Sequence, residues 1–167
     1  MSSKHLSERD NWQTETGNDA NKNEQRTHSL LRERLDTVKY SIKKKSKILI
    51  GKTTICPELL IENTKNGKKV VIDDKLGKNG GNAHERCYRY FANNRVEKAG
   101  YTPIIVFSGP TFAAKDKFQV YHKKGVTSVN PEKYRQEFED FLEPEQYFIS
   151  DGSNIEILVK RIEEILK

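Results

Sequence analysis

The sequence contains few of the residues that mark secreted, zinc-binding or membrane proteins. Two cysteines, Cys56 and Cys87, occur in 167 residues, and neither belongs to a Cys-x-x-Cys or Cys/His pattern. This argues against a zinc site or a disulfide framework. No apolar run approaches the roughly 18 residues of a transmembrane helix, and no signal peptide is recognisable. We therefore expect a cytoplasmic protein with reduced thiols and no membrane partner.

Apolar residues are also scarce relative to charged ones. The chain is 34% hydrophobic and 32% charged, and its formal net charge is +6. A chain of this length suits one domain with a sizeable core and a highly polar surface. The positive excess favours a polyanionic partner such as nucleic acid. Because many ordinary proteins are equally basic, composition alone does not identify that partner.

The amino-terminal segment, residues 1–27, is polar and carries four basic and five acidic side chains. Such a composition argues against independent folding. On composition alone the segment is expected to be a flexible tail. Residues 28–167 show no internal repeat and no linker, so we expect one domain there.

A basic helix is predicted next, over about 27–46. Its apolar stripe consists of Leu31, Leu35, Val38 and Ile42, which are spaced four, three and four residues apart. Residues 32–52 contain eight Lys or Arg against two acids. Within this run, Lys43, Lys44 and Lys45 form a candidate surface for non-specific phosphate binding; the alternative is a solvated helix end.

A hairpin follows, with a possible catalytic cluster at its end. Leu59–Ile61 and Lys69–Lys75 read as strands joined by the turn dipeptide Asn66-Gly67. Since side chains alternate along a strand, Asp73 and Lys75 share one face and Asp74 points away. The hairpin can also bring Glu58 beside Asp73.

Two neighbouring carboxylates either share a proton or hold a cation. Mg²⁺ suits Glu58 and Asp73, because it prefers oxygen ligands and completes its shell with water and substrate phosphate. Lys75 would steady the attacking water or the developing charge, and such a group hydrolyses phosphodiesters. The alternative is a solvated surface pair, because Asp-x-Lys is short and common.

Gly80-Gly81 is a turn, and Asn82 with Glu85 has the form of a capping box that starts a helix running to Gly100. Asn and Arg86 at a helix start are also side chains that read base edges in the major groove. The alternative is a well-capped helix with no further role.

The remainder of the chain alternates strands and helices. We expect strands at Thr102–Ser108, Phe118–His122 and Gln146–Ser150, a helix over Pro131–Leu142, and a closing helix capped by Ser153. Together these elements predict an α/β sandwich with a central mixed β-sheet flanked by helices.

The segment Gly81–Arg86, Gly-Asn-Ala-His-Glu-Arg, resembles a motif of the EcoRI/MunI group of Type II restriction endonucleases. In that group the motif follows a PD…(D/E)xK nuclease centre, as it follows Pro57-Glu58 and Asp73-x-Lys75 here. Residues between Leu6 and Gln25, and the segment Thr102–Phe112, are also similar to parts of this group.

The resemblance implies a restriction-endonuclease-like fold and a Mg²⁺-dependent, sequence-specific endonuclease that cuts double-stranded DNA as a homodimer. It also implies a short site with an A·T-containing core. Glu58 and Asp73 would bind the metal and Lys75 would assist the water. The DNA-binding residues would be Gly81, Asn82, Ala83 and Arg86, with Ala83 on a thymine methyl group. The amino-terminal segment would be an arm on the domain or the DNA.

Two departures from the group keep other functions open. The usual Asp after proline is Glu58, and the usual strand Glu is Asp73, which leaves the combined reach of the pair unchanged. The linker from Lys75 to Gly81 is also short. The alternatives are the small cleavage subunit of a heterodimer with a larger recognition subunit, and a DNA-binding protein on a catalytically decayed nuclease fold.

Overall fold

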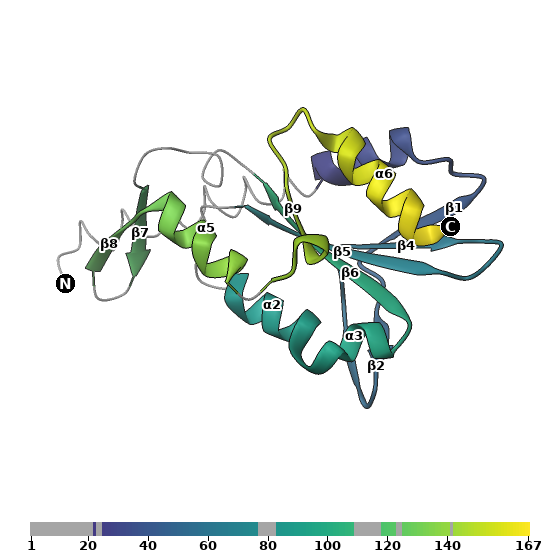
Figure 1. Ribbon diagram of the computed structural model, residues 1–167, viewed down its shortest axis with the longest axis horizontal. Coiled ribbons are helices and arrows are strands. Elements are labelled where there is room, and N and C mark those ends of the chain that lie inside the picture. Colours follow the sequence, from purple (N-terminus) through teal and green to yellow (C-terminus); the bar gives the residue numbers. More distant parts are fainter. Residues whose placement is uncertain (1–21, 23–24, 77–82, 109–117, 123–124, 141) are drawn as a thin grey trace.

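The computed structural model describes residues 22, 25–76, 83–108, 118–122, 125–140 and 142–167. A five-stranded sheet in the order β1-β4-β5-β6-β9 forms its centre (Figure 1). The first three strands of that order pair antiparallel and the last three pair parallel. The predicted mixed sheet of an α/β fold is confirmed. Its strands are β1 Tyr40–Lys44, β4 Leu59–Asn63, β5 Lys69–Leu76, β6 Tyr101–Ser108 and β9 Tyr147–Ile149.

The predicted hairpin is formed by β4 and β5, which pair from Leu59 opposite Ile72 to Glu62 opposite Lys69. Gly67 ends the connecting turn at a φ of 73°, a left-handed conformation that glycine adopts without strain. The parallel neighbour β6 is interior to the sheet, as its unbroken apolar run predicts.

Helices cover both faces of the sheet (Figure 1). One face is covered by the helix of residues 25–34 and by α6, Ile155–Leu166, which share a buried cluster with β4, β5 and β6. On the other face a second cluster joins the sheet to the β2–β3 hairpin and to α2, α3 and α5. These elements are β2 Ile48–Ile50, β3 Thr53–Ile55, α2 Ala83–Phe91, α3 Arg95–Lys98 and α5 Pro131–Glu139.

The prediction of a helix over 27–46 is wrong for the second half of that range. The helix ends at residue 34, and the Asp36 carboxylate then accepts a hydrogen bond from the Val38 amide in a turn that leads into β1. Val38 is 88% exposed, although the predicted stripe placed it in the core. Tyr40 and Ile42 fit a strand as well as a helix, and pairing with β4 favours the strand.

The helix predicted to run to Gly100 is broken into α2, the 3₁₀ turn Ala92–Asn94, and α3. Asn93 and Asn94 have φ angles of 57° and 51°, in the left-handed region that Asn tolerates better than most residues. Two consecutive residues in that region interrupt the helical path.

Three smaller features differ from expectation or add to it. Strand β3 and strand β8, Gly125–Val129, were not predicted; β8 pairs with β7, Phe118–His122. Ser153 does not cap α6, because the Asp151 carboxylate accepts from the Ser153 and Asn154 amides and shapes that loop. A 3₁₀ turn, η2, Pro144–Gln146, precedes β9.

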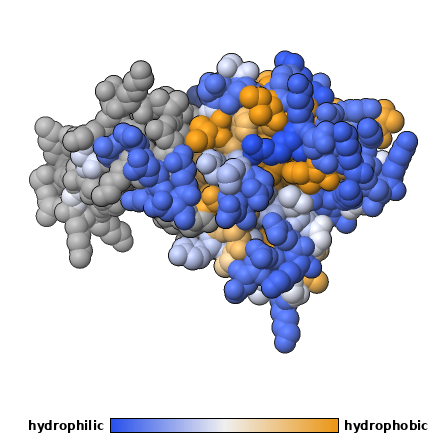
Figure 2. Space-filling view, in the orientation of Figure 1, coloured by the Kyte–Doolittle hydropathy of each residue, from blue (hydrophilic) through white to orange (hydrophobic). Residues whose placement is uncertain are grey.

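The described surface in Figure 2 is largely hydrophilic, with hydrophobic residues gathered near the middle of this face. None of the helices in the described part of the chain combines the length and apolar sequence that a bilayer crossing requires.

Candidate active site

The predicted cluster of two carboxylates and one ammonium group forms at the carboxyl end of β5. The Lys75 Nζ lies 3.1 Å from the Asp73 Oδ2 and 3.9 Å from the Glu58 Oε1. Asp73 and Lys75 share the sheet face that α2 covers, because they alternate with Asp74 and continue the row of Val71. Glu58, which immediately precedes β4, reaches the same point from the neighbouring strand.

A main-chain hydrogen bond fixes the Glu58 carboxylate. The β4–β5 ladder ends at Leu59 opposite Ile72, so the Asp74 N–H lies beyond the last pair. The Glu58 Oε2 accepts from that N–H at 2.6 Å and satisfies a donor that the ladder leaves open. The longer glutamate therefore reaches the backbone of β5, while the shorter aspartate suffices on β5 itself. With Glu at position 58 and Asp at position 73, both carboxylates lie within 3.9 Å of the Lys75 ammonium group.

The surroundings disfavour two negative charges unless a cation compensates them. Asp73 is fully buried, and burial together with the Asp73 charge raises the pKa of Glu58 from 4.5 to about 8. Lys75 and the Asp74 N–H act in the opposite direction. On α2, burial and the Asp73 charge raise the pKa of the Cys87 thiol to about 12, which makes it a poor nucleophile.

The donor set fits Mg²⁺. It consists of carboxylate oxygens, with no nitrogen or sulfur ligand, and Mg²⁺ is commonly bound by one or two carboxylates with the remaining positions left to water and substrate phosphate. Within the described ranges, no group of three or more His, Cys, Asp or Glu side chains is placed to hold a metal ion. Glu58 and Asp73 are thus the two carboxylates that this cluster offers to a cation.

The raised pKa of Glu58 gives a prediction about stability in a chelating buffer. Between pH 4.5 and about 8 the folded protein keeps a proton on Glu58 that the unfolded chain has lost. Its free energy of unfolding should therefore fall as the pH rises through that window. Glu58→Gln removes this contribution, and urea denaturation in EDTA at several pH values should show a smaller fall for the variant, by a few kcal/mol. Parallel pH profiles for the two proteins would contradict the assignment.

The predicted base-reading residues are described only in part. Gly81 and Asn82 lie outside the described residues, and α2 begins at Ala83, directly after the predicted cap. Ala83 and Arg86 belong to the first turn of α2, but their side chains are outside the described set. Cys87, in the following turn, packs in the same buried cluster as Val71 of β5.

The predicted phosphate-binding lysines lie on a strand instead of a helix. Lys43 and Lys44 are exposed at the end of β1, an edge strand, and Lys44 is opposite Leu59. The Lys45 amide donates to the Glu58 carbonyl at 3.0 Å, and Lys45 has a φ of 45°. The lysine run therefore ends beside one of the two clustered acids.

One contact at the site has no counterpart in the sequence predictions. The Thr27 Oγ1 donates a hydrogen bond to the Asp74 Oδ2, and both residues are buried on the face opposite Asp73. The two residues lie 47 positions apart in the chain, so no local pattern could have predicted the contact. Asp74 points away from the cluster as predicted, yet its backbone N–H is part of it.

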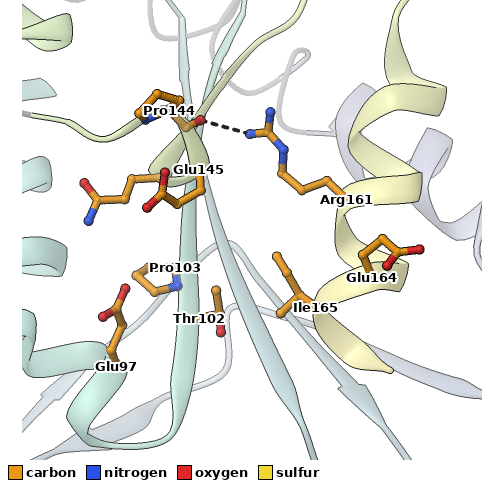
Figure 3. Close-up of a pocket in the computed structure, with 9 residues that line it drawn as sticks. Glu97, Thr102, Pro103, Pro144, Glu145, Arg161, Glu164 and Ile165 are labelled. Carbon is orange, nitrogen blue, oxygen red and sulfur yellow. Dashed lines mark hydrogen bonds between the residues drawn. The ribbon is translucent and has the colours of Figure 1, made fainter.

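A separate pocket of about 430 Å³ lies at the opposite end of the sheet (Figure 3). It is lined by the start of β6, the η2 turn and α6. The Arg161 guanidinium, which is its basic group, donates to the carbonyls of Pro144 and Tyr147 and so holds η2 and β9. The described residues that line the pocket include Glu97, Glu145 and Glu164 but no lysine, and its arginine is engaged with main-chain carbonyls, so it is not our candidate site.

Comparisons with known proteins agree with this architecture. A family model described as Type II restriction enzyme MunI matches residues 1–55. Among solved structures, the crystal structure of MunI restriction endonuclease in complex with cognate DNA matches with a TM-score of 0.50 and 20% sequence identity. The match covers 77% of this chain and 83% of that one. A search of curated proteins finds no match. The predicted resemblance to the EcoRI/MunI group is thus confirmed in the fold and in the first third of the sequence.

Proposed function

We propose that this protein is a Mg²⁺-dependent Type II restriction endonuclease that hydrolyses phosphodiester bonds in double-stranded DNA at a short, specific site. The observation that carries the proposal is the convergence of Glu58, Asp73 and Lys75 at the end of β5. This convergence occurs in a chain whose fold matches MunI. The intact cluster also argues against a catalytically decayed fold.

Each member of the cluster has a separate role in this reaction. Glu58 and Asp73 would hold Mg²⁺, which supplies Lewis-acid chemistry at the scissile phosphate. The Lys75 ammonium group, 15% exposed, would orient the attacking water and stabilise the negative charge that develops on the phosphoryl oxygens. The Asp74 N–H keeps the Glu58 carboxylate directed at this point.

Base recognition belongs to the start of α2 in this proposal. Gly81 and Asn82 precede the helix, and Ala83 and Arg86 lie in its first turn. Asn pairs well with adenine, an Arg fork pairs well with guanine, and Ala can contact a thymine methyl group. The packing of Cys87 against the strand that carries Asp73 and Lys75 supports this role, because it places α2 beside that strand. An A·T-containing core of the site follows from the resemblance alone.

The lysine run gives a prediction about salt. Replacing Lys43, Lys44 and Lys45 together with Gln should weaken binding to cognate and random duplexes by similar factors, because phosphate contacts carry no sequence information. The slope of log affinity against log salt concentration should become shallower by roughly one unit for each lost contact. Fluorescence anisotropy at several salt concentrations measures both quantities.

A matched control removes the same charge elsewhere. Lys65, Lys68 and Lys160 are exposed, and the first two lie in the β4–β5 turn at the far end of the sheet. Their replacement with Gln should leave the slope nearly unchanged. Equal slopes for the two triple variants would place Lys43–Lys45 away from the DNA.

The homodimer, with one cleavage centre per strand, completes the proposal. Residues 28–167 would form the nuclease domain, residues 1–27 an arm on the domain or the DNA, and the protein would act on DNA in the cytoplasm. Light scattering gives the oligomeric state directly. A monomer that only nicks plasmid would instead identify the small cleavage subunit of a heteromeric enzyme.

Incubation of supercoiled plasmid DNA with the purified protein tests the activity. In Mg²⁺ the plasmid should be converted to a discrete set of linear fragments, and EDTA should abolish the conversion. An unchanged plasmid, or one degraded to a smear at the same rate in EDTA, would overturn the proposed function.

A further inference from the structure

Buried polar residues gather behind the candidate active site. Five polar or charged residues of the described chain are buried, and four of them form two adjacent pairs, Thr27-His28 and Asp73-Asp74. The Thr27 hydroxyl donates to the Asp74 carboxylate inside this buried region. A buried carboxylate is costly unless hydrogen bonds compensate it, so such an acid between two site residues calls for a specific role.

Asp74 connects the two faces of the sheet. Its side chain is held on the face covered by the helix of residues 25–34, while its main-chain N–H donates to the Glu58 Oε2 at 2.6 Å. Asp73 and Lys75, its neighbours in β5, project to the opposite face. Asp74 pairs with Val106 of β6, and the Thr27 contact adds a second restraint, from outside the sheet, on the backbone that carries Asp73 and Lys75 and aligns the Glu58 carboxylate.

The donor is itself rigidly placed. The helix that carries Thr27 packs through Leu31, and Leu35 directly after its end, into the core cluster shared with α6. Arg34 of the same helix forms an ion pair with Glu156 of α6. Thr27 is thus a fixed point outside the sheet, in contrast to a side chain on a free loop.

We propose that Thr27 and Asp74 are positioning residues that set the geometry of the Glu58 and Asp73 carboxylates for divalent-metal binding; this rests on the proposed function of that site. Groups that orient metal ligands typically change metal affinity or activity by about 10–100-fold when they are removed. Loss of the Thr27 hydroxyl removes the restraint on the Asp74 side chain, which loosens the alignment of the Asp74 N–H with the Glu58 carboxylate. The effect passes through hydrogen bonds and not through the charge of Asp74.

The test measures Mn²⁺ binding by electron paramagnetic resonance, which does not depend on catalysis, together with plasmid cleavage. Thr27→Val should raise the Mn²⁺ dissociation constant by about 10–100-fold and lower the cleavage rate at subsaturating metal by a similar factor. Thr27→Ser, which keeps the hydroxyl, should restore both values to within about threefold of the wild type. Wild-type Mn²⁺ affinity in Thr27→Val would overturn the inference.

Two further variants separate positioning from general loosening. Leu31→Ala removes a fully buried apolar side chain from the next turn of the same helix and leaves the Thr27 hydroxyl in place. It should lower the melting temperature and leave Mn²⁺ affinity unchanged; an equal loss of affinity would overturn the inference. If Thr27→Val does not fold, the double variant Thr27→Val/Asp74→Asn is compared with the single variant Asp74→Asn. Because the side chain that Asp74→Asn introduces is neutral, removing the Thr27 hydroxyl then leaves no buried charge without a hydrogen-bond donor. The roughly 10–100-fold loss should persist there, and its absence would count against positioning.

The two proposals can fail separately. If the wild-type protein neither binds Mn²⁺ nor cuts DNA, the proposed function is wrong, and so is the positioning role that rests on it. If the wild-type protein does both and the Thr27→Val variant has the same Mn²⁺ affinity and cleavage rate, the proposed function is retained. Only the positioning role of Thr27 and Asp74 is then wrong.

Discussion

Asp73→Asn is expected to reduce DNA cleavage by about a thousandfold or more at Mg²⁺ concentrations that saturate the wild type, since a bound metal supplies several kcal/mol of transition-state stabilisation. The Asp73 carboxylate is fully buried and lies 3.1 Å from the Lys75 Nζ. A side chain on the surface cannot reach this buried position to act as a metal ligand in its place. The amide is at best a weak ligand for Mg²⁺. Single-turnover cleavage of plasmid over a range of Mg²⁺ concentrations measures the loss.

Binding and folding serve as the controls for this variant. The substitution removes one of two mutually repelling carboxylates, and Lys75 keeps Glu58 as a partner at 3.9 Å, so the fold should persist. Specific DNA binding, measured without cleavage in Ca²⁺, should remain close to that of the wild type. Near-normal cleavage by Asp73→Asn would show that the metal is held elsewhere.

Lys75→Ala should lower the cleavage rate by roughly 10²–10³-fold, the loss seen when one donor to transition-state charge is removed. Its ammonium group is 15% exposed and lies between both carboxylates, where it can act on charge that develops during phosphoryl transfer. The loss should appear in the rate at saturating DNA. DNA affinity should change little.

The opposing hypothesis assigns Lys75 to binding. A lysine that only clamps a phosphate would weaken DNA affinity on removal and leave the maximal rate intact. Rate measurements at saturating enzyme, combined with anisotropy measurements of affinity, separate the two. A loss confined to affinity would contradict a catalytic role for Lys75.

Local patterns account for the parts of this structure that the sequence predicts well. The β4–β5 hairpin follows from Asn66-Gly67 and the β-branched run before Asp73, and strand alternation then puts Asp73 and Lys75 on one face. Glu58 joins them because it immediately precedes the paired strand. Each of these inferences depends on residues fewer than 20 positions apart.

Longer-range contacts account for the parts that the sequence does not predict. The run from Leu35 to Ile42 fits a helical stripe and a strand equally well, and only pairing of β1 with β4 decides between them. The Thr27–Asp74 hydrogen bond joins residues 47 positions apart, and both become buried only when the chain folds, so the sequence gives no sign of it. Similarly, Asn93 and Asn94 break the predicted helix through backbone conformations that asparagine permits but does not require.

The central claim is that Glu58, Asp73 and Lys75 form a sequence-specific Mg²⁺ nuclease on this fold. Sequencing of the DNA ends that the protein produces from a large genomic substrate tests it most directly, with Asp73→Asn as the matched control. The wild type should generate ends at one short sequence, cut on both strands, in Mg²⁺ and not in EDTA. Wild-type ends no more frequent than those of Asp73→Asn, or ends scattered without regard to sequence, would contradict the claim.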